Sequence, residues 1–255
     1  MIFMSMLTKE LKELARSYKL LFVPLLFALL GVSQPVSFKM MPTLLASAGN
    51  LPKGTVIEIP VPPPGEVVAQ AIGQFNQAGI LLLVLIAMGA IAGERLSGVA
   101  ATVLTKPVGR GEYLLAKASA FSLLAVFSLA AGMALTAYYT QVLVGPVDWS
   151  DVAVGSALYL PNLLLAIAVT LSLSTFMPSP LAAGGTALVT VMVLNTVPRY
   201  LGPTIAKLHP GKLTESAVKA LAGQEYIAAG PIAGVAAMIA VALVLGWLTL
   251  RRQEI

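Results

Sequence analysis

The sequence predicts an all-α integral membrane protein with six transmembrane helices. Of the 255 residues, 58% are hydrophobic and only 11% are charged, whereas soluble domains carry about a quarter of their residues as charges. The mean hydropathy is +0.88, and the cations gather at the ends of long apolar runs, as expected where helices end at a membrane surface. Lipid must therefore surround most of the chain, and we expect one multi-pass transmembrane domain over residues 1-255 in the cell membrane.

The N-terminal residues 1-17 predict an amphipathic helix. Leu7, Leu11, Leu14 and Tyr18 recur at the spacing that places them on one face. The other face is expected to carry the charges, namely Lys9, Glu10, Lys12, Glu13 and Arg16. Such a helix can lie in the membrane interface with its apolar side in the lipid. The alternative is a simple lead-in to the first span.

Six apolar runs predict the transmembrane helices, at about 18–36, 70–93, 114–144, 152–176, 181–198 and 227–249. Between the first two lies a polar segment, 37–66, which ends in a proline-rich run expected to be stiff and extended. Residues 199-226 mix charges with apolar residues and predict a helical, re-entrant segment outside the cell. In this topology ten cations lie on the side of the two termini and six on the other, which places both termini in the cytoplasm.

Several classes of function require residues or motifs that this sequence does not contain. The chain has no cysteine and a single histidine, His209, which we expect in a surface loop, so paired-histidine metal chemistry is excluded. It has no phosphate-binding loop of the G-x-x-x-x-G-K-[ST] type. We therefore expect no catalytic residues, no metal site and no cofactor bound by this chain. The membrane topology accounts for the basic residues, so we expect no nucleic-acid partner.

The predicted spans are unusually poor in charge. Asp, Glu, Lys, Arg and His are absent from 118–147, 152–198 and 226–250, although ion-coupled transporters generally carry such a residue near the membrane midplane. The milder polar residues that could line a substrate path are Asn76, Gln77, Asn162 and Asn195. Alternatively, these side chains form hydrogen bonds between helices. Two glycine pairs of the G-x-x-x-G type indicate close helix packing, namely Gly89/Gly93 and Gly230/Gly234.

A charged loop over 94-117 separates the second and third spans. The residues that form its sequence pattern are, in chain order, Gly93-Glu94, Gly98, Leu104, Pro107, Gly109, Arg110, Tyr113 and Lys117. This order resembles the cytoplasmic loop of the ATP-binding-cassette type-2 (exporter) permease family, with Val99 in place of the family's usual threonine. The six-span layout, the N-terminal helix and the polar segment before the last span add to the resemblance.

The resemblance implies a transmembrane permease subunit of an ATP-driven ABC exporter. Two permease subunits, as a homodimer or a heterodimer, would share the lipid bilayer with two copies of an ABC ATP-binding subunit, which binds ATP and Mg and carries the ATPase activity. A coupling helix at about 95–105 would dock on that subunit. The residues implied in coupling are Glu94, Arg95, Gly98, Leu104, Lys106, Pro107 and Arg110.

The uncharged spans favour a hydrophobic or amphipathic cargo moved outward, such as a drug, a peptide antibiotic or a lipid. Two other functions remain open from the sequence. A stand-alone secondary transporter or channel would work without an ATPase and would carry an inverted repeat. A structural membrane protein would show no transport.

Overall fold

The structure is a computed structural model that describes residues 2–48, 62–98 and 109–252. Within these residues every regular element is a helix, which confirms the all-α fold class. In chain order the elements are α1 (Ile2–Arg16), α2 (Lys19–Ala48), α3 (Pro64–Gln74), the π-helix η1 (Phe75–Gly79), α4 (Ile80–Ala87), α5 (Gly89–Leu96), α7 (Arg110–Leu143), α8 (Trp149–Phe176), α9 (Pro180–Thr196), the 3-10 helix η2 (Val197–Tyr200), α10 (Pro203–Ala206), α11 (Pro210–Leu221) and α12 (Ala229–Arg252).

Among the described residues, five helical stretches are long and apolar enough to cross a membrane. They are Lys19–Thr43, Pro64–Leu96, Arg110–Leu143, Trp149–Phe176 and Ala229–Arg252. The sixth expected span corresponds to α9, which has 17 residues, somewhat fewer than the roughly twenty that a bilayer requires. The chain is thus a multi-pass membrane protein, and the count of six spans stays a prediction.

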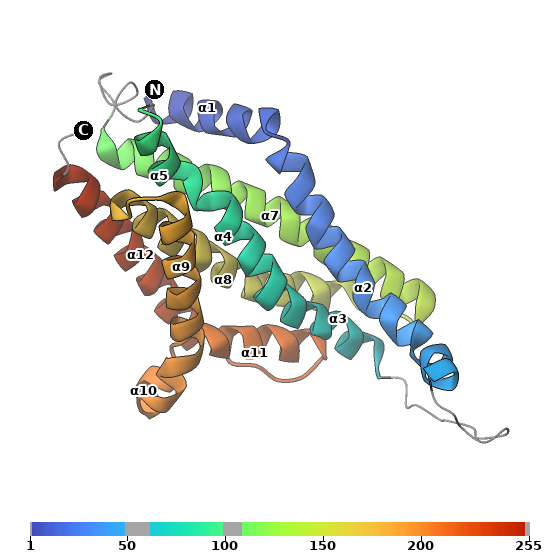
Figure 1. Ribbon diagram of the computed structural model, residues 1–255. Coiled ribbons are helices and arrows are strands. Elements are labelled where there is room, and N and C mark those ends of the chain that lie inside the picture. The colour runs from blue at the N-terminus through green and yellow to red at the C-terminus, as the bar shows by residue number, and fades with distance from the viewer. Residues whose placement is uncertain (1, 49–61, 99–108, 253–255) are drawn as a thin grey trace.

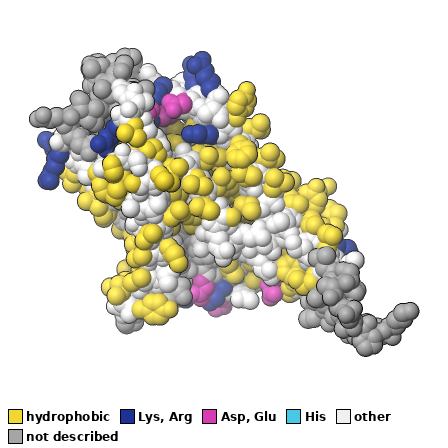
Figure 2. Space-filling model, in the orientation of Figure 1, with side chains coloured by type: hydrophobic (Ala, Val, Ile, Leu, Met, Phe, Trp, Pro, Cys, Tyr) yellow, Lys and Arg dark blue, Asp and Glu magenta, His cyan; other side chains and the backbone are white. Residues whose placement is uncertain are grey.

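The bundle has two polar ends with an apolar band between them. Figure 1 places α1, the end of α5, the start of α7 and both termini at one end, which we call the terminal end. The end of α2, the start of α3, α10 and α11 lie at the opposite end, the far end. Figure 2 shows Lys, Arg, Asp and Glu side chains gathered at these two ends and hydrophobic side chains between them. This is the surface expected of a helical bundle surrounded by lipid.

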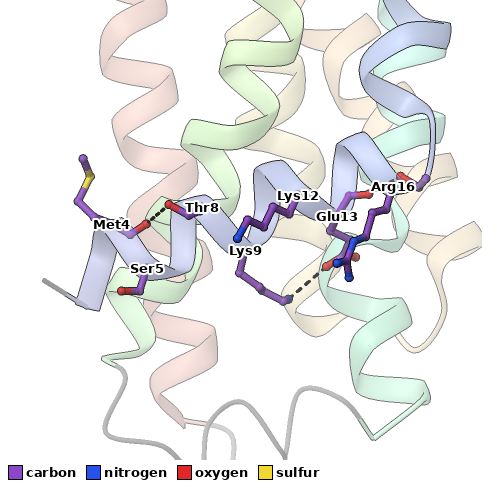
Figure 3. Close-up of a pocket in the computed structure, with 8 residues that line it drawn as sticks. Met4, Ser5, Thr8, Lys9, Lys12, Glu13 and Arg16 are labelled. Carbon is purple, nitrogen blue, oxygen red and sulfur yellow. Dashed lines mark hydrogen bonds and ion pairs between the residues drawn. The ribbon is translucent and has the colours of Figure 1, made fainter.

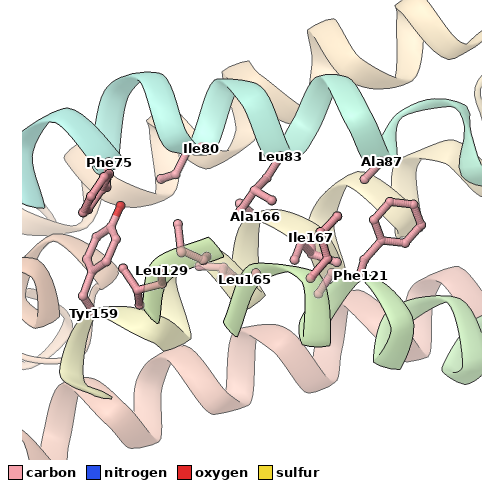
Figure 4. Close-up of a cluster of buried hydrophobic side chains, with 14 of the residues drawn as sticks. Phe75, Ile80, Leu83, Ala87, Phe121, Leu129, Tyr159, Leu165, Ala166 and Ile167 are labelled. Atoms are coloured by element: carbon pink, nitrogen blue, oxygen red, sulfur yellow. The ribbon is translucent and has the colours of Figure 1, made fainter. Parts of the chain in front are cut away.

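The helix α8 forms the centre of the bundle, because α4, α5, α7, α9, α11 and α12 all pack against it. Its buried side chains meet those of α4 and α7 in an apolar core, drawn in Figure 4 with Leu83, Phe121 and Leu165. The helices α2 and α7 cross closely: a Cβ atom added to Gly31 would lie 2.6 Å from the backbone oxygen of Gly132. The backbones of these two helices therefore touch.

Three expected boundaries are wrong. The helix α2 continues to Ala48, so the expected outer polar segment does not begin at residue 37. The second span begins at Pro64 rather than 70, because the extended Pro63 (φ −53, ψ 145) and the helix-compatible φ of Pro64 start the helix there. The proline-rich run before it lies mostly outside the described residues. The third helical span begins at Arg110, since Glu112 accepts a hydrogen bond from the backbone nitrogen of Gly109 (3.2 Å) and caps the helix.

The segment before the last span is helical, as expected, and its re-entrant placement stays a prediction. The helix α11 lies across the far end and packs against α8 and α3. His209 caps it, because its Nδ1 accepts a hydrogen bond from the backbone nitrogen of Lys212 (3.3 Å). The histidine is 5% exposed, so the expectation of a surface histidine was wrong.

Candidate functional site: the base of the charged loop

Five charged side chains meet at the terminal end and form what we call the base network: Lys9, Glu10, Glu13, Glu94 and Lys117. The ammonium of Lys117 lies 2.8 Å from Glu94 Oε1 and 3.0 Å from Glu10 Oε2. Lys9 Nζ lies within 3.2 Å of the carboxylates of Glu10, Glu13 and Glu94. The network thus joins α1 to the end of α5 and to the first turns of α7.

The central pair of this network is buried. The side chain of Lys117 is 1% exposed and that of Glu10 is 4% exposed. The hydroxyl of Tyr113 donates a hydrogen bond to Glu94 Oε2, so the carboxylate of Glu94 is held from two sides. A buried carboxylate and a buried ammonium are tolerated only when each is paired in this way. The carboxylates of Glu10, Glu13 and Glu94 lie close together, and the two lysines account for that cluster as an ion network.

The network also fixes the charge state of Lys9, which lies on α1. Partial burial acts to lower the pKa of this lysine, but its hydrogen bond to Glu10 and the charges of Glu10, Glu94 and Glu13 outweigh burial and raise the pKa above its ordinary value. Lys9 is therefore protonated throughout the physiological pH range, and its ion pairs persist there.

Sequence reasoning placed Glu10 on the solvated face of α1 and treated Lys117 as a loop cation. The signal that could have found the pair is the spacing of Leu7, Glu10, Leu11 and Leu14, which puts Glu10 inside the apolar stripe. A carboxylate on a buried face needs a buried cation. Lys117 lies seven residues inside α7, where it supplies that charge.

Two arginines at the ends of the loop bind the carbonyl ends of other helices. Arg95 Nη1 donates a hydrogen bond to the backbone oxygen of Thr175, in the last turn of α8. Arg110 Nη1 donates to the backbone oxygens of Leu250 (2.7 Å) and Arg251 (2.6 Å), in the last turn of α12. Helix C-termini carry unpaired carbonyl groups and partial negative charge, which a guanidinium group satisfies. Both arginines therefore tie the loop to the bundle.

We expect Arg110→Gln to destabilise the protein by about 1–2 kcal/mol, because it removes a charged donor from the end of α12. The matched control is Arg252→Gln, which removes an exposed arginine at the same helix end. Thermal unfolding of the purified protein and hydrogen exchange of the last turn of α12 measure the effect. Equal losses in the two variants would show that the two carbonyl bonds contribute little.

The loop itself is shorter than expected. The helix α5 ends at Leu96, and Gly98 takes the left-handed conformation with φ 75, which a helix cannot continue through. A helix that starts at residue 95 is therefore interrupted at Gly98, and the rest of the expected coupling helix, residues 99–105, lies outside the described residues. Arg110, Tyr113 and Lys117 belong to α7 rather than to the loop. Leu104, Lys106 and Pro107 lie outside the described residues.

A bend between α4 and α5 sets the direction in which the charged loop begins. Between α4 and α5 the side chain of Ser174 accepts a hydrogen bond from the backbone nitrogen of Ala92 (2.9 Å) and donates one to the backbone oxygen of Met88 (2.8 Å). The hydroxyl thus replaces the direct helical bond between Ala92 and Met88. A side chain inserted in this way bends a helix. α8 therefore sets the direction in which α5 carries Glu94 and Arg95.

Comparison with known proteins identifies the family of the chain. Residues 4–254 match the model of the family described as "ABC-2 family transporter protein". The chain belongs to this family. It is also 33% identical over 182 residues to "Uncharacterized transmembrane protein YxlG" of Bacillus subtilis (strain 168), which covers 71% of this chain and 70% of that protein.

This ABC-2 family protein is therefore the membrane component of an ABC-2 type transporter, and the resemblance stated from the sequence is confirmed. Membrane components of this family are generally non-catalytic and generally work with an ATP-binding subunit.

The outward face of α1 lies beside the base network in this ABC-2 protein. The buried side of α1 packs against α7 and α2, so part of its apolar stripe is covered by protein rather than left free for lipid. Its polar side borders a groove of about 880 Å³, drawn in Figure 3, which is lined by Met4, Ser5, Thr8, Lys9, Lys12, Glu13, Arg16 and Ser17. The interfacial position of α1 stays a prediction.

The four expected path residues fall into two places. Asn162 is buried on α8, and its Nδ2 donates to Thr214 Oγ1 (2.6 Å) and to the backbone oxygen of Pro210 (3.2 Å), so it holds α11 in place. Asn195 Nδ2 donates to the backbone oxygen of Val191 within α9. Asn76 and Gln77 lie on η1, where Gln77 is exposed. The structure does not bring the four side chains together, and a role of any of them in transport stays a prediction.

Proposed function

We propose that this chain is the permease subunit of an ATP-driven ABC exporter. The observation that carries the proposal is that both ends of the charged loop are tied to the bundle: Glu94 to α1 and α7, Arg95 to α8, and Arg110 to α12. A force on this loop therefore acts on four helices at once. That is the property required of an element that passes a rigid-body movement to the membrane spans.

In this proposal the seven coupling residues divide into two groups. Gly98, Leu104, Lys106 and Pro107 contact the ATP-binding subunit, while Glu94, Arg95 and Arg110 transmit the movement through their contacts within the chain. The polar side of α1 borders the same end of the bundle and adds a cationic surface from Lys12 and Arg16. The partner surface would accordingly be acidic.

The complete transporter would contain two permease subunits, as a homodimer or a heterodimer, and two ATP-binding subunits that hold ATP and Mg. Both termini would face the cytoplasm, beside the loop, since Figure 1 places them at the same end. The cargo would be hydrophobic or amphipathic, such as a drug, a peptide antibiotic or a lipid. ATP binding would close the ATPase pair and move the cargo outward.

The test is a mild-detergent pull-down of the tagged chain from its native membrane, followed by mass spectrometry. Glu94 and Arg110 are poor positions for a docking variant, because changing them disturbs contacts within the chain. We therefore choose Leu104→Asp, which places a charge in the loop, and compare it with Leu201→Asp, which changes an exposed leucine at the far end.

We expect an ATPase with a phosphate-binding loop in the eluate of the unchanged chain and of the Leu201→Asp variant. Leu104→Asp should lower its yield about tenfold or more, as expected when a contact at the centre of an interface is lost. An eluate that holds only the folded chain would contradict the proposal and favour a stand-alone transporter or a structural protein.

A further inference from the structure

A groove lined by glutamine side chains lies between α2, α3, η1 and the end of α11. It has a volume of about 570 Å³. We call it the glutamine groove and define it by Gln34, Glu66, Gln70, Gln74, Gln77 and Gln224. In Figure 2 the surface over α3 and α11 is formed largely by backbone and by side chains that are neither hydrophobic nor charged, and it interrupts the hydrophobic band.

The groove follows one face of the second spanning helix. Glu66, Gln70, Gln74 and Gln77 recur at helical spacing along it, while the opposite face carries buried apolar residues such as Ile72 and Phe75. At about 1.5 Å per residue, Gln77 lies about 20 Å along the helix from its start at Pro64. The spanning stretch Pro64–Leu96 has 33 residues, so at this rise it is longer than the hydrocarbon layer, which is about 30 Å thick. The stripe occupies the part of this stretch nearest the far end, and Gln77 lies deepest along it.

A π-helix shapes the inner part of this stripe. The segment Phe75–Gly79 is π-helical, and such single turns widen the helix and shift the register of its side chains. Gln77 thereby lies on the exposed side of η1, beside Gln70 and Gln74 in the lining of the groove. Gln74 is positioned by Ser33 of α2, whose hydroxyl donates to Gln74 Oε1 (3.0 Å).

This composition is unsuited to contact with lipid. Side-chain amides exposed to hydrocarbon lose their hydrogen bonds to water, which is strongly unfavourable. Elsewhere on the same helix the exposed positions are apolar, for example Leu81 and Leu85. The groove therefore faces water or a polar ligand. Its described lining contains Glu66 and no cation, which disfavours an anionic ligand. Amides donate and accept hydrogen bonds without charge, so they match neutral groups of the same kind.

We propose that the glutamine groove is a water-filled binding site, open toward the far end, which takes the neutral amide-bearing part of the transported molecule. The proposal rests on the proposed transport function and deepens it. The apolar part of an amphipathic cargo would remain in contact with the hydrophobic surface, while the groove replaces the water around its polar part.

The first test uses the absence of cysteine from the sequence. Single-cysteine variants Gln34→Cys, Gln70→Cys and Gln77→Cys are compared in membranes with Leu81→Cys and Leu85→Cys, which are exposed on the next turns of the same spanning helix. A small, uncharged, water-soluble maleimide is the probe. Because the reactive thiolate forms only in contact with water, the groove cysteines should react about tenfold faster or more than the two controls.

The second test measures protection of the Gln77→Cys variant. Decanamide and decanoate have the same tail, and they differ only in that the first carries a neutral amide and the second a carboxylate. The amide compound should slow labelling several-fold and the carboxylate should not. Equal effects, or none, would overturn the assignment of ligand class. Labelling no faster than in the leucine controls would show a lipid-facing groove and overturn the proposal.

Disulfide cross-linking between two copies of the chain tests whether the groove is instead covered by a second subunit. If the groove cysteines resist the maleimide but link two copies of the chain through a disulfide, the groove is a seam between subunits and the proposal is wrong. Each variant is first checked for an unchanged unfolding temperature and for the ATPase in its eluate. Absence of an ATPase from the eluate of the unchanged chain would contradict the proposed function, whereas the labelling pattern of the cysteine variants tests the groove itself.

Discussion

Replacing Lys117 by methionine is expected to destabilise the protein by about 3–5 kcal/mol, the cost typical of breaking a buried ion pair. The ammonium of Lys117 lies between Glu10 and Glu94 and is 1% exposed. Methionine fills a similar volume but leaves two carboxylates without their central cation. The cost arises from these uncompensated charges rather than from lost packing. Thermal unfolding in detergent measures it, and we expect a decrease of about 10 °C.

Two further variants identify the cause. Lys12→Met removes an exposed lysine from the outer side of α1 and should leave the unfolding temperature nearly unchanged. The triple variant Glu10→Gln, Glu94→Gln and Lys117→Met removes the charges together and should recover most of the loss, since neutral side chains carry no charge to desolvate. A triple variant as unstable as Lys117→Met alone would show that shape, not charge, holds the base network.

Gly31→Ala should also be strongly destabilising, by about 1–3 kcal/mol or more, because the crossing of α2 and α7 has no room for a methyl group. The added Cβ would lie 2.3 Å from Thr136 Oγ1 and 2.6 Å from the backbone oxygen of Gly132. A side chain can rotate away, but the backbone of α7 cannot move without disturbing its packing against α8. The two helices would have to separate along their length.

The matched control is Gly185→Ala on α9, where an added Cβ meets nothing within 4 Å. This change should be neutral or stabilising by about 0.5–1 kcal/mol, because alanine favours the helix more than glycine does. The unfolding temperatures of the two purified variants measure the difference. If both alanines are tolerated equally, the close approach of α2 and α7 is not needed for stability.

The glycine pairs illustrate how far pattern reasoning extends. Of the two G-x-x-x-G pairs that indicated close packing, Gly234 does lie against the backbone of Leu208, with an added Cβ 2.1 Å from its oxygen, but Gly89 and Gly93 have space around them. The tightest crossing of spanning helices uses Gly31 and Gly132, which form no pattern in the sequence. Spacing marks the positions that could pack closely, and only the partner helix decides which of them do.

At the candidate site, too, the sequence pattern predicted one part and the packing of the helices determined the other. The order of residues from Glu94 to Lys117 was sufficient to indicate the family. It was not sufficient to show that Glu94, Arg95 and Arg110 contact α7, α8 and α12 of their own chain. Their partners are distant in sequence: a hydrogen bond joins Arg110 to Leu250, 140 residues away. Local periodicity carries no information about such a contact.

The all-α membrane fold, the positions of most helices and the family could be predicted from the amino-acid sequence alone. These follow from hydrophobic runs, from the charges at their ends and from the order of residues in one loop, all of which are local or compositional. Three features became visible only once the helices were packed together: Glu10 and Lys117 form a buried pair, Ser174 bends the second span, and glutamines from α2 and α3 share one groove. These features depend on packing because a polar group in a bundle is stabilised by its partner, and the way the helices pack determines which group that partner is.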